Sequence, residues 1–175
     1  MATFSIRLFP DPVLRQASLE VENIDGTLAK LADDMIETMY EAPGVGLAAP
    51  QIGVQRRMFV YDIGDGPNVV VNPAILESSG EWSYQEGCLS IPGMYWDLVR
   101  PKQVLLRGYN LAGEELEVEA DELLARCFQH EMDHLDGVLV LERIEPAQRK
   151  EAMAELRRRA LQADPATAPL AGLRR

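Results

Sequence analysis

The stretch DELLARCFQHEMDHLDG, residues 121–137, decides how the rest of the chain is arranged. Its apolar residues recur at helical spacing, so it predicts one amphipathic helix that lies deep in the domain. Asp121 is a favourable N-cap, because its carboxylate can accept the free N–H groups of the first turn. Gly137 stands where a left-handed residue commonly ends a helix. The narrow polar arc of this helix consists of Glu122, Arg126, Gln129 and Asp133.

The same stretch contains an H-E-x-x-H motif at residues 130–134. A spacing of four residues places His130 and His134 on one helical face, one turn apart, where both can bind a single metal ion. Glu131 follows the first histidine and can be aimed at a water held by that metal. The alternative is a chance match on a surface helix. Against it, the chain has only two histidines, both fall in the motif, and their face is otherwise apolar.

A catalytic metal usually has three protein ligands and one open position. No His or Cys follows His134, so the third ligand must be a carboxylate or one of the two cysteines. Cys88 lies in a stretch punctuated by Gly and Pro, residues 86–93, and such a loop has the freedom to reach a metal beside a rigid helix. Cys127 is on the metal-facing stripe but is better explained as a wall of the pocket. We therefore favour Cys88, because a thiolate with two imidazoles suits zinc or Fe(II).

The composition is that of an ordinary soluble globular domain. The 175 residues are 47% hydrophobic and 26% charged, which suits one domain with a substantial core and excludes disorder of the whole chain. The net charge of −11 is uneven, because residues 1–146 carry −15 and residues 147–175 carry +4. An acidic body argues against a broad nucleic-acid-binding face, so we expect no DNA partner.

Targeting signals are missing from the sequence as given. The N-terminal residues MATFSIRLFPDP lack the charged segment and apolar run of a signal peptide. No stretch approaches 18 consecutive apolar residues, so no membrane span is expected. These observations favour a cytoplasmic protein whose cysteines stay reduced.

The remaining sequence predicts a mixture of helices and strands. A helix runs from a cap at Asp25 or Thr27 to about Glu41, and its polar side, which includes Asp34, is expected to face water. Residues 44–53 and 86–93 are predicted loops, because glycine and proline interrupt both. Strands are expected at 57–62, 69–71, 74–77, 81–85 and 139–141, a hairpin at 103–109 and 115–120, and a helix at 146–162 with Pro146 at its first position.

Three stretches in this order, GVGLAAPQIG (44–53), EGCLS (86–90) and QHEMDHLDG (129–137), resemble the motifs that define the peptide deformylase family. The resemblance extends from about Phe9 to Leu141. It implies an α+β fold in which antiparallel and mixed β-sheets pack around the central H-E-x-x-H helix, followed by a C-terminal helix. It also implies a hydrolase that removes the N-terminal formyl group from N-formylmethionine of newly synthesised polypeptides and releases formate.

The resemblance assigns site residues by position. It implies that Cys88, His130 and His134 hold one divalent metal ion, which would be Fe²⁺ in the cell, with Zn²⁺, Ni²⁺ or Co²⁺ as substitutes in vitro. Glu131 matches the catalytic acid and base. The residues expected to polarise the formyl carbonyl are Gln51, through its amide, and Leu89, through its backbone N–H. The residues expected to contact substrate are Val45, Gly46, Glu86 and Cys127, besides His130.

Domain limits and partners complete the expectations. Residues 1–163 are expected to form one catalytic domain, and residues 164–175 a flexible tail. The implied partners are N-formylmethionyl nascent peptides. The basic cluster at 157–159 is a candidate contact with the ribosome, and the alternative, which is the commoner role of a basic helix end, is that it is simply solvated. Arg100 and Asp133 are a candidate ion pair that would brace the central helix.

Two other functions stay open on the residues alone. One is a different H-E-x-x-H hydrolase, such as a peptidase, although no clear downstream ligand supports it. The other is a non-catalytic module with a closed zinc site, in which Cys127 would be the fourth ligand.

Overall fold

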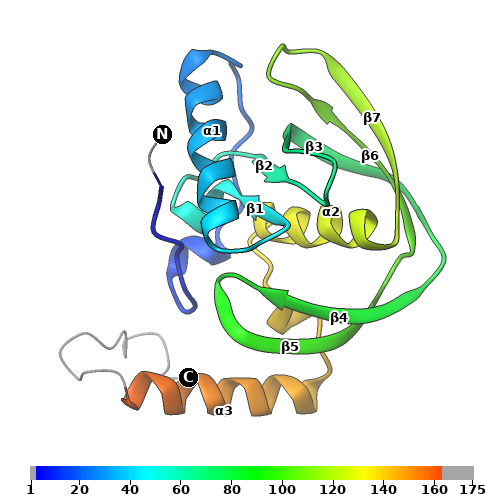
Figure 1. The fold of residues 1–175 in the computed structure, drawn as a ribbon. Coiled ribbons are helices and arrows are strands. Elements are labelled where there is room, and N and C mark those ends of the chain that lie inside the picture. The colour runs from blue at the N-terminus through cyan, green and yellow to red at the C-terminus, as the bar shows by residue number, and fades with distance from the viewer. Residues whose placement is uncertain (1–2, 163–175) are drawn as a thin grey trace.

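The computed structural model describes residues 3–162, and Figure 1 shows their arrangement. The predicted tail, residues 164–175, lies outside the described residues, as does residue 163. In chain order the elements are the 3-10 helix η1 (Pro12–Arg15), α1 (Gly26–Glu41), β1 (Gly46–Ala48), the 3-10 helix η2 (Ala49–Ile52), β2 (Met58–Tyr61), β3 (Asn68–Ser79), β4 (Trp82–Cys88), β5 (Ile91–Arg100), β6 (Gln103–Tyr109), β7 (Glu115–Asp121), α2 (Glu122–Leu135), the 3-10 helix η3 (Val140–Glu142) and α3 (Pro146–Gln162).

Two antiparallel sheets surround the central helix α2. One has five strands in the order β1-β2-β3-β6-β7, and the other is the hairpin β4-β5. Figure 1 shows α2 lying between the five-stranded sheet and the hairpin, with α3 on the far side of the hairpin. A parallel bridge joins Leu19 and Arg56. The α+β fold predicted from the motifs, with sheets around the H-E-x-x-H helix and a C-terminal helix, is confirmed.

The start of α2 differs from the prediction. Asp121 occupies the N-cap position, but its side chain makes no capping hydrogen bond within the described part of the chain. The reason is that β7 runs to Asp121, and the N–H of Glu122 instead bonds the carbonyl of Lys102 at 2.9 Å. The end of α2 is as expected, because Gly137 has φ +73° and closes the helix.

The apolar face of α2 packs on the five-stranded sheet. Phe128 is fully buried, and its ring meets those of Tyr61 and Phe59 at centroid distances of 4.9 and 5.8 Å. The helix was expected to lie deep in the domain, and three residues of its polar arc are buried as well, since Arg126, Gln129 and Asp133 are all at most 8% exposed. The hairpin β4-β5 covers this side of α2. Arg126 bonds Glu86 of β4, Asp133 pairs with Arg100 of β5, and Gln129 donates to the carbonyl of Pro101, which follows β5.

Helix α1 is capped as predicted. The Asp25 carboxylate accepts the N–H groups of Thr27 and Leu28, each at 3.0 Å. The prediction that Asp34 faces water is wrong, because this residue is only 6% exposed. The N-terminal segment passes over the same face, where the Phe4 N–H bonds Thr38 Oγ1 at 3.0 Å.

Three strand predictions also change. Residues 69–71 and 74–77 belong to one strand, β3, whose register shifts where Asn72 adopts φ +49°. The predicted loop 86–93 is mostly strand, because residues 86–88 end β4 and residues 91–93 begin β5, a strand that the sequence pattern did not indicate. The predicted loop 44–53 contains β1 and η2. Residues 139–141 are not a strand, because η3 begins at Val140 and the Glu142 carboxylate accepts the Leu139 N–H at 2.9 Å.

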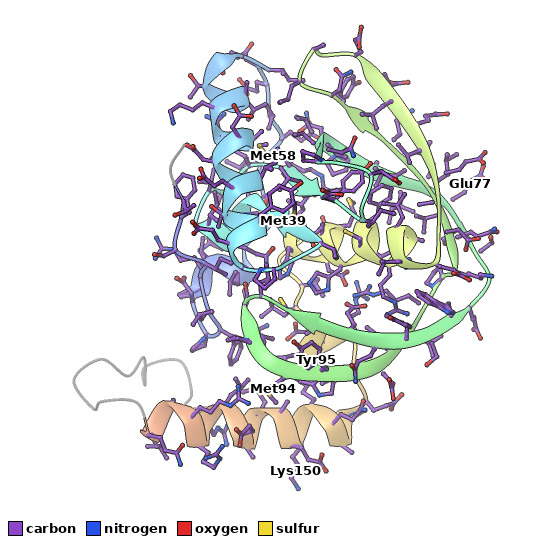
Figure 2. All side chains as sticks on the ribbon, viewed as in Figure 1. Met39, Met58, Glu77, Met94, Tyr95 and Lys150 are labelled. Atoms are coloured by element: carbon purple, nitrogen blue, oxygen red, sulfur yellow. The ribbon has the colours of Figure 1, made fainter. Side chains whose placement is uncertain are left out.

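Helix α3 attaches to the rest of the molecule through a third cluster of buried residues. Ala152 is its buried residue, and Met94 of β5 packs against the same cluster. Figure 2 shows Met94 between β5 and α3. Among residues 3–162, none of the helices combines the length and the apolar character that a membrane span requires.

Candidate metal centre and substrate cavity

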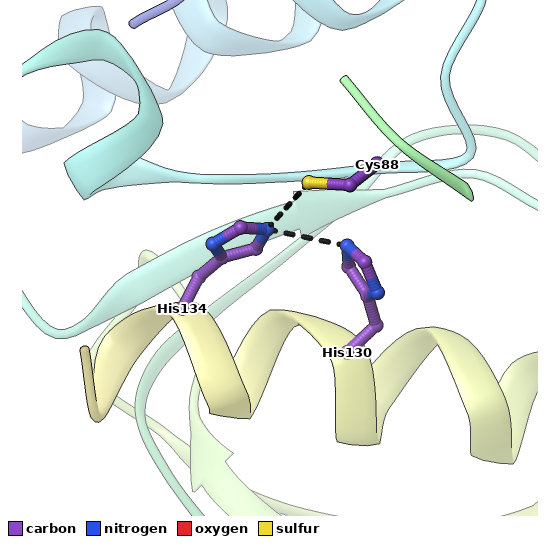
Figure 3. Close-up of side chains that lie close together, drawn as sticks. All are labelled: Cys88, His130 and His134. Atoms are coloured by element: carbon purple, nitrogen blue, oxygen red, sulfur yellow. Dashed lines mark hydrogen bonds between the residues drawn. The ribbon is translucent and has the colours of Figure 1, made fainter. Parts of the chain in front are cut away.

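The sequence-predicted ligands meet at one point (Figure 3). Cys88 is the last residue of β4, and the two histidines lie one turn apart on α2. The Nε2 of His134 is 3.3 Å from the Sγ of Cys88 and 3.2 Å from the Nε2 of His130. All three donor atoms lie within 4.8 Å of one another.

This spacing suits a shared metal ion. In a tetrahedral zinc site, Zn–N bonds of about 2.0–2.1 Å and Zn–S bonds of about 2.3 Å separate neighbouring ligand atoms by about 3.3–3.6 Å. The distances that His134 makes to the other two donors are close to that range. Three such donors leave a fourth coordination position for solvent or substrate. The donor set therefore fits a catalytic divalent metal.

One of the two histidines is oriented by a carboxylate. His130 Nδ1 is 2.7 Å from Oε1 of Glu86, so its Nε2 is left for the metal. Glu86 in turn accepts hydrogen bonds from Arg100 at 2.7 and 2.8 Å and from Arg126 at 2.7 Å. Such an outer partner fixes the tautomer and the ring orientation of a ligand histidine.

The predicted brace between Arg100 and Asp133 is present. Arg100 Nη2 lies 3.0 Å from Oδ2 of Asp133, and Arg143 binds the same carboxylate. Arg100 therefore connects two carboxylates. One is Glu86, which contacts His130, and the other is Asp133, which precedes His134 in the sequence. The pairing holds the ligand-bearing turn of α2 against β5.

Glu131 lies beside the donor atoms and against β1. It is 3% exposed, and its Oε2 has no hydrogen-bond partner among the described residues. A Cβ added at Gly46 would overlap Oε1 of Glu131 and lie 2.9 Å from Sγ of Cys127. The GVGLA segment thus passes so close to the carboxylate that only glycine fits at position 46.

Gln51 is placed with its donor toward the cysteine. Its Oε1 accepts the Ala48 N–H at 2.9 Å, which fixes the orientation of the amide. The Nε2 then lies 3.9 Å from Cys88 Sγ and 3.2 Å from Ser90 Oγ. Leu89 is in the turn between β4 and β5 and, like Gln51, lines the cavity described after the donor groups.

Cys127 is separate from the donor group. It is 4% exposed, and its Sγ lies 3.7 Å from the Val45 carbonyl. Within the described residues, the group whose atoms could share a metal contains Cys88, His130 and His134 without it. This placement matches the expected pocket wall and offers no support for a closed four-ligand site.

The buried groups have shifted proton affinities. Burial alone would raise the pKa of the Cys88 thiol, but the imidazoles of His134 and His130 bring it well below its usual value. For Cys127, burial raises the pKa, and the charges of Glu131 and Glu86 raise it further. Burial raises the pKa of Glu131, the two imidazoles lower it, and the charges of Cys88 and Glu86 raise it, with a raised pKa as the result. One cysteine is thus suited to be a thiolate ligand and the other to remain a neutral thiol.

Cys88, His130 and Glu131 line a cavity of about 400 Å³. Val45, which is 45% exposed, and Tyr95, which is 63% exposed, are at its open side. Figure 2 places Tyr95 on β5. The cavity walls also include all the other residues predicted to contact substrate, namely Gly46, Glu86, Cys127 and His130.

Fold and site together define a class of protein, the metal-dependent hydrolases with an H-E-x-x-H helix. Known proteins narrow the class. A family model described as polypeptide deformylase matches residues 3–150. A peptide deformylase of Clostridium botulinum is 53% identical over 143 residues, which are 82% of this chain and 97% of that protein. One from Acidothermus cellulolyticus is 51% identical over 157 residues, 90% of this chain and 87% of that protein.

Solved structures agree. The crystal structure of a peptide deformylase from Legionella pneumophila has a TM-score of 0.87 at 42% identity and covers 93% of this chain and 99% of that one. The peptide deformylase from Ehrlichia chaffeensis, in complex with actinonin, has a TM-score of 0.87 at 37% identity, with coverage of 91% and 98%. The chain belongs to the peptide deformylase family. It is a metal-dependent hydrolase that removes N-formyl groups from nascent peptides.

Sequence reasoning missed part of the site. Arg126 was assigned only to the polar arc of α2, yet it bonds Glu86. Trp82 and Ser90 were not singled out, yet the Trp82 carbonyl accepts from Arg126 and the Ser90 hydroxyl accepts from Gln51. The signal available was a single arginine one turn before His130 on a helix that is mostly apolar. Nothing in the sequence, however, indicated that a strand 40 residues upstream would cover it.

Proposed function

We propose that Cys88, His130 and His134 hold the one divalent metal ion of this deformylase. The observation that carries the proposal is the convergence of these three donors at a cavity that Cys88, His130 and Glu131 line. When bound, such a metal lowers the pKa of a water ligand and polarises a carbonyl. We further propose that residues 1–163 act as a single catalytic domain.

Glu131 is the proton carrier in this proposal. Its raised pKa and its unpartnered Oε2 suit a group that accepts a proton from the attacking water and returns it to the leaving amine. Gln51 donates from Nε2 to the formyl oxygen, where negative charge grows, and the Leu89 N–H donates to the same oxygen. The contact between Gln51 Oε1 and Ala48 keeps this donor aimed without rearrangement.

The substrate backbone lies along β1 in this proposal. β1 pairs with β2 on one side only, so its other edge is free to bond an extended peptide at Val45 and Gly46. The side chain of the formylated methionine enters the part of the cavity lined by Glu86, Cys127 and His130. A formyl group carries hydrogen where acetyl carries methyl, and the close wall at Gly46 and Glu131 excludes the larger group.

Formate release from formyl-Met-Ala-Ser by anaerobically prepared protein tests these roles. Glu131→Gln should lower kcat by about 10²–10⁴-fold while the protein keeps its metal. Acetyl-Met-Ala-Ser should not be cleaved. A Glu131→Gln protein with undiminished kcat, or comparable cleavage of the acetyl peptide, would contradict the assignment.

For the metal itself, we propose Fe²⁺ in the cell, with Zn²⁺, Ni²⁺ and Co²⁺ as substitutes in vitro. A thiolate and two imidazoles accept all four ions, and cellular supply decides among them. Metal analysis of protein purified without oxygen should find iron, and exposure to air should lower activity with oxidation of Cys88. Cys127→Ala should keep the metal. Loss of metal in that variant would indicate the closed site instead.

A cytoplasmic location and a ribosome contact through α3 complete the proposal. The substrate is a nascent chain, and α3 carries the basic run 157–159 on the outside of the molecule. Arg158 and Arg159 both bind Glu155, so the run keeps a net positive charge. Ribosome co-sedimentation that falls with salt, and is lost on truncation after Glu145, is expected. Equal co-sedimentation of the truncated protein would refute this contact.

A further inference from the structure

The carboxylate of Glu86 joins the hairpin β4-β5 to two successive turns of α2. Its Oε1 faces His130 Nδ1 at 2.7 Å, and its Oε2 accepts from Arg126 Nη1 at 2.7 Å. Arg126 and His130 are four residues apart on α2, and Glu86 is on β4. The three side chains are at most 12% exposed. Solvent therefore contributes little to the position of this carboxylate.

Each oxygen of Glu86 has two neighbouring nitrogen atoms within hydrogen-bond distance. Arg100 donates from Nη2 to Oε1 and from Nε to Oε2, at 2.7 and 2.8 Å. This edge-on pair treats the two oxygens alike and leaves one acceptor direction on each. Arg126 takes the remaining direction on Oε2. Only Oε1 then has an acceptor direction left, and it faces His130.

Arg126 is held in place by groups other than Glu86. Its Nη2 donates to the backbone carbonyls of Trp82 and Leu98 at 2.8 and 2.9 Å. Its guanidinium lies over the Trp82 ring at 5.1 Å, and that ring stacks on Tyr84 with a centroid distance of 4.6 Å. The side chain is 4% exposed. Arg126 thus has a fixed position of its own from which it can orient the carboxylate.

We propose that Arg126 is a positioning residue for the metal ligand His130, acting through Glu86. By donating to Oε2 from its own fixed position, Arg126 adds a third hydrogen bond to the two from Arg100 and so holds the carboxylate with its other oxygen, Oε1, at His130 Nδ1. His130 is then fixed in the ring orientation that turns Nε2 toward His134 and Cys88. The inference rests on the proposed metal site, and it predicts that Arg126 governs metal retention although it does not touch the metal.

The test compares Arg126→Met with Arg143→Met. Both remove one guanidinium from the same ion network, but Arg143 binds Asp133 and not Glu86. Zinc-loaded proteins are mixed with a chromophoric chelator to measure release of zinc. Cobalt-loaded proteins give the absorption spectrum, which reports ligand geometry. Unfolding of the metal-free forms by urea measures stability separately, and Arg126→Lys supplies a variant that keeps the charge.

Arg126→Met should release zinc about 10–100-fold faster than the wild type and should shift the cobalt spectrum. The fall in kcat/KM should lie mainly in kcat, and Arg126→Lys should be intermediate. Arg143→Met should stay near wild type in zinc release and spectrum. Equal behaviour of Arg126→Met and Arg143→Met, or losses that follow the urea midpoint in both, would overturn the inference. If the proposed metal site were wrong, the wild-type protein itself would fail to bind zinc or cobalt at these ligands. If only this inference were wrong, the wild type would bind metal normally and Arg126→Met would behave like Arg143→Met.

Discussion

Helices α2 and α3 each contribute an arginine to an ion pair with a glutamate, at the same distance but in opposite surroundings. Arg126 and Glu86 approach to 2.7 Å with side chains 4% and 5% exposed. Arg159 and Glu155 also approach to 2.7 Å, but their side chains are 40% and 30% exposed. A distance alone therefore does not tell what an ion pair contributes. The contribution depends on what happens to the charge that remains when its partner is removed.

The two regions also differ in what they hold in place. The buried pairs lie between α2 and the hairpin β4-β5, next to the donors of the candidate metal site. The exposed pairs lie along α3, and one of them reaches the hairpin, where Arg159 Nη1 donates to the Pro92 carbonyl at 2.8 Å. Changes in the first region should alter stability and the site together, whereas changes in the second should alter neither.

The largest effect should come from Glu86→Gln. This change leaves Arg100 and Arg126 buried against a neutral amide. We expect a loss of about 3–5 kcal/mol in the free energy of unfolding of the metal-free protein, measured with urea. Metal binding should weaken as well, because His130 loses its carboxylate. A loss under about 1 kcal/mol, as for a surface pair, would remove the contrast between the two helices.

The stability that the Glu86 carboxylate contributes should depend on pH. Burial alone would raise the pKa of Glu86, but Arg100 and His130 lower it far below its usual value. A carboxylate with a lowered folded-state pKa adds stability fully above its unfolded pKa of about 4.3, and that stability declines as pH falls toward the folded pKa. The difference in unfolding free energy between wild type and Glu86→Gln should therefore shrink below about pH 4. A difference that stays constant from pH 6 to pH 3 would contradict this.

Arg143→Met should reduce the free energy of unfolding by less than Glu86→Gln does. The variant tests an ion pair whose exposure lies between that of the buried and the exposed pairs. The Arg143 side chain is 48% exposed. When Arg143 is replaced, its partner Asp133 still pairs with Arg100. We expect a loss of at most about 1 kcal/mol in urea unfolding. A loss as large as that of Glu86→Gln would mean that the network acts as one unit.

The smallest effect should come from Glu155→Gln on α3. The guanidinium groups of Arg158 and Arg159 lower the pKa of Glu155 to about 2. Its pairs are nevertheless open to solvent and screened by salt. We expect no measurable change in melting temperature in low salt or in high salt. A clear fall that disappears in high salt would show that α3 depends on these pairs.

The same contrast explains what the sequence could predict. Helices with a strong apolar period, α1 and α2, were predicted to within a few residues, and so were α3 and the hairpin β6-β7. Cys88 was placed with the histidines by the need for a third ligand and by the resemblance to the family motifs. The helix and hairpin predictions needed no knowledge of which segments meet, whereas the placement of Cys88 depended on the resemblance.

The errors involve residues whose partners are distant in sequence. The polar arc of α2 was identified, but the distant partners of Arg126 and Gln129, Glu86 and the Pro101 carbonyl, were not, because a local pattern does not indicate which segment packs on that side. β5 escaped notice because Pro92 and Gly93 interrupt its start, and only Trp96, Leu98 and Arg100 alternate inward. Residues 139–141 looked like a strand because Leu139 and Leu141 are apolar, but they fill a core without pairing to a sheet.

Cys88 ends a strand of the small sheet, and both histidines stand on the helix that packs on the large one. An ion held by all three would tie these two parts of the molecule together, so its binding energy would add to the resistance of the whole chain to unfolding. A cell short of metal would then hold not an idle enzyme but a shorter-lived one, since proteases act on the opened chain. The abundance of the protein would itself follow the metal supply.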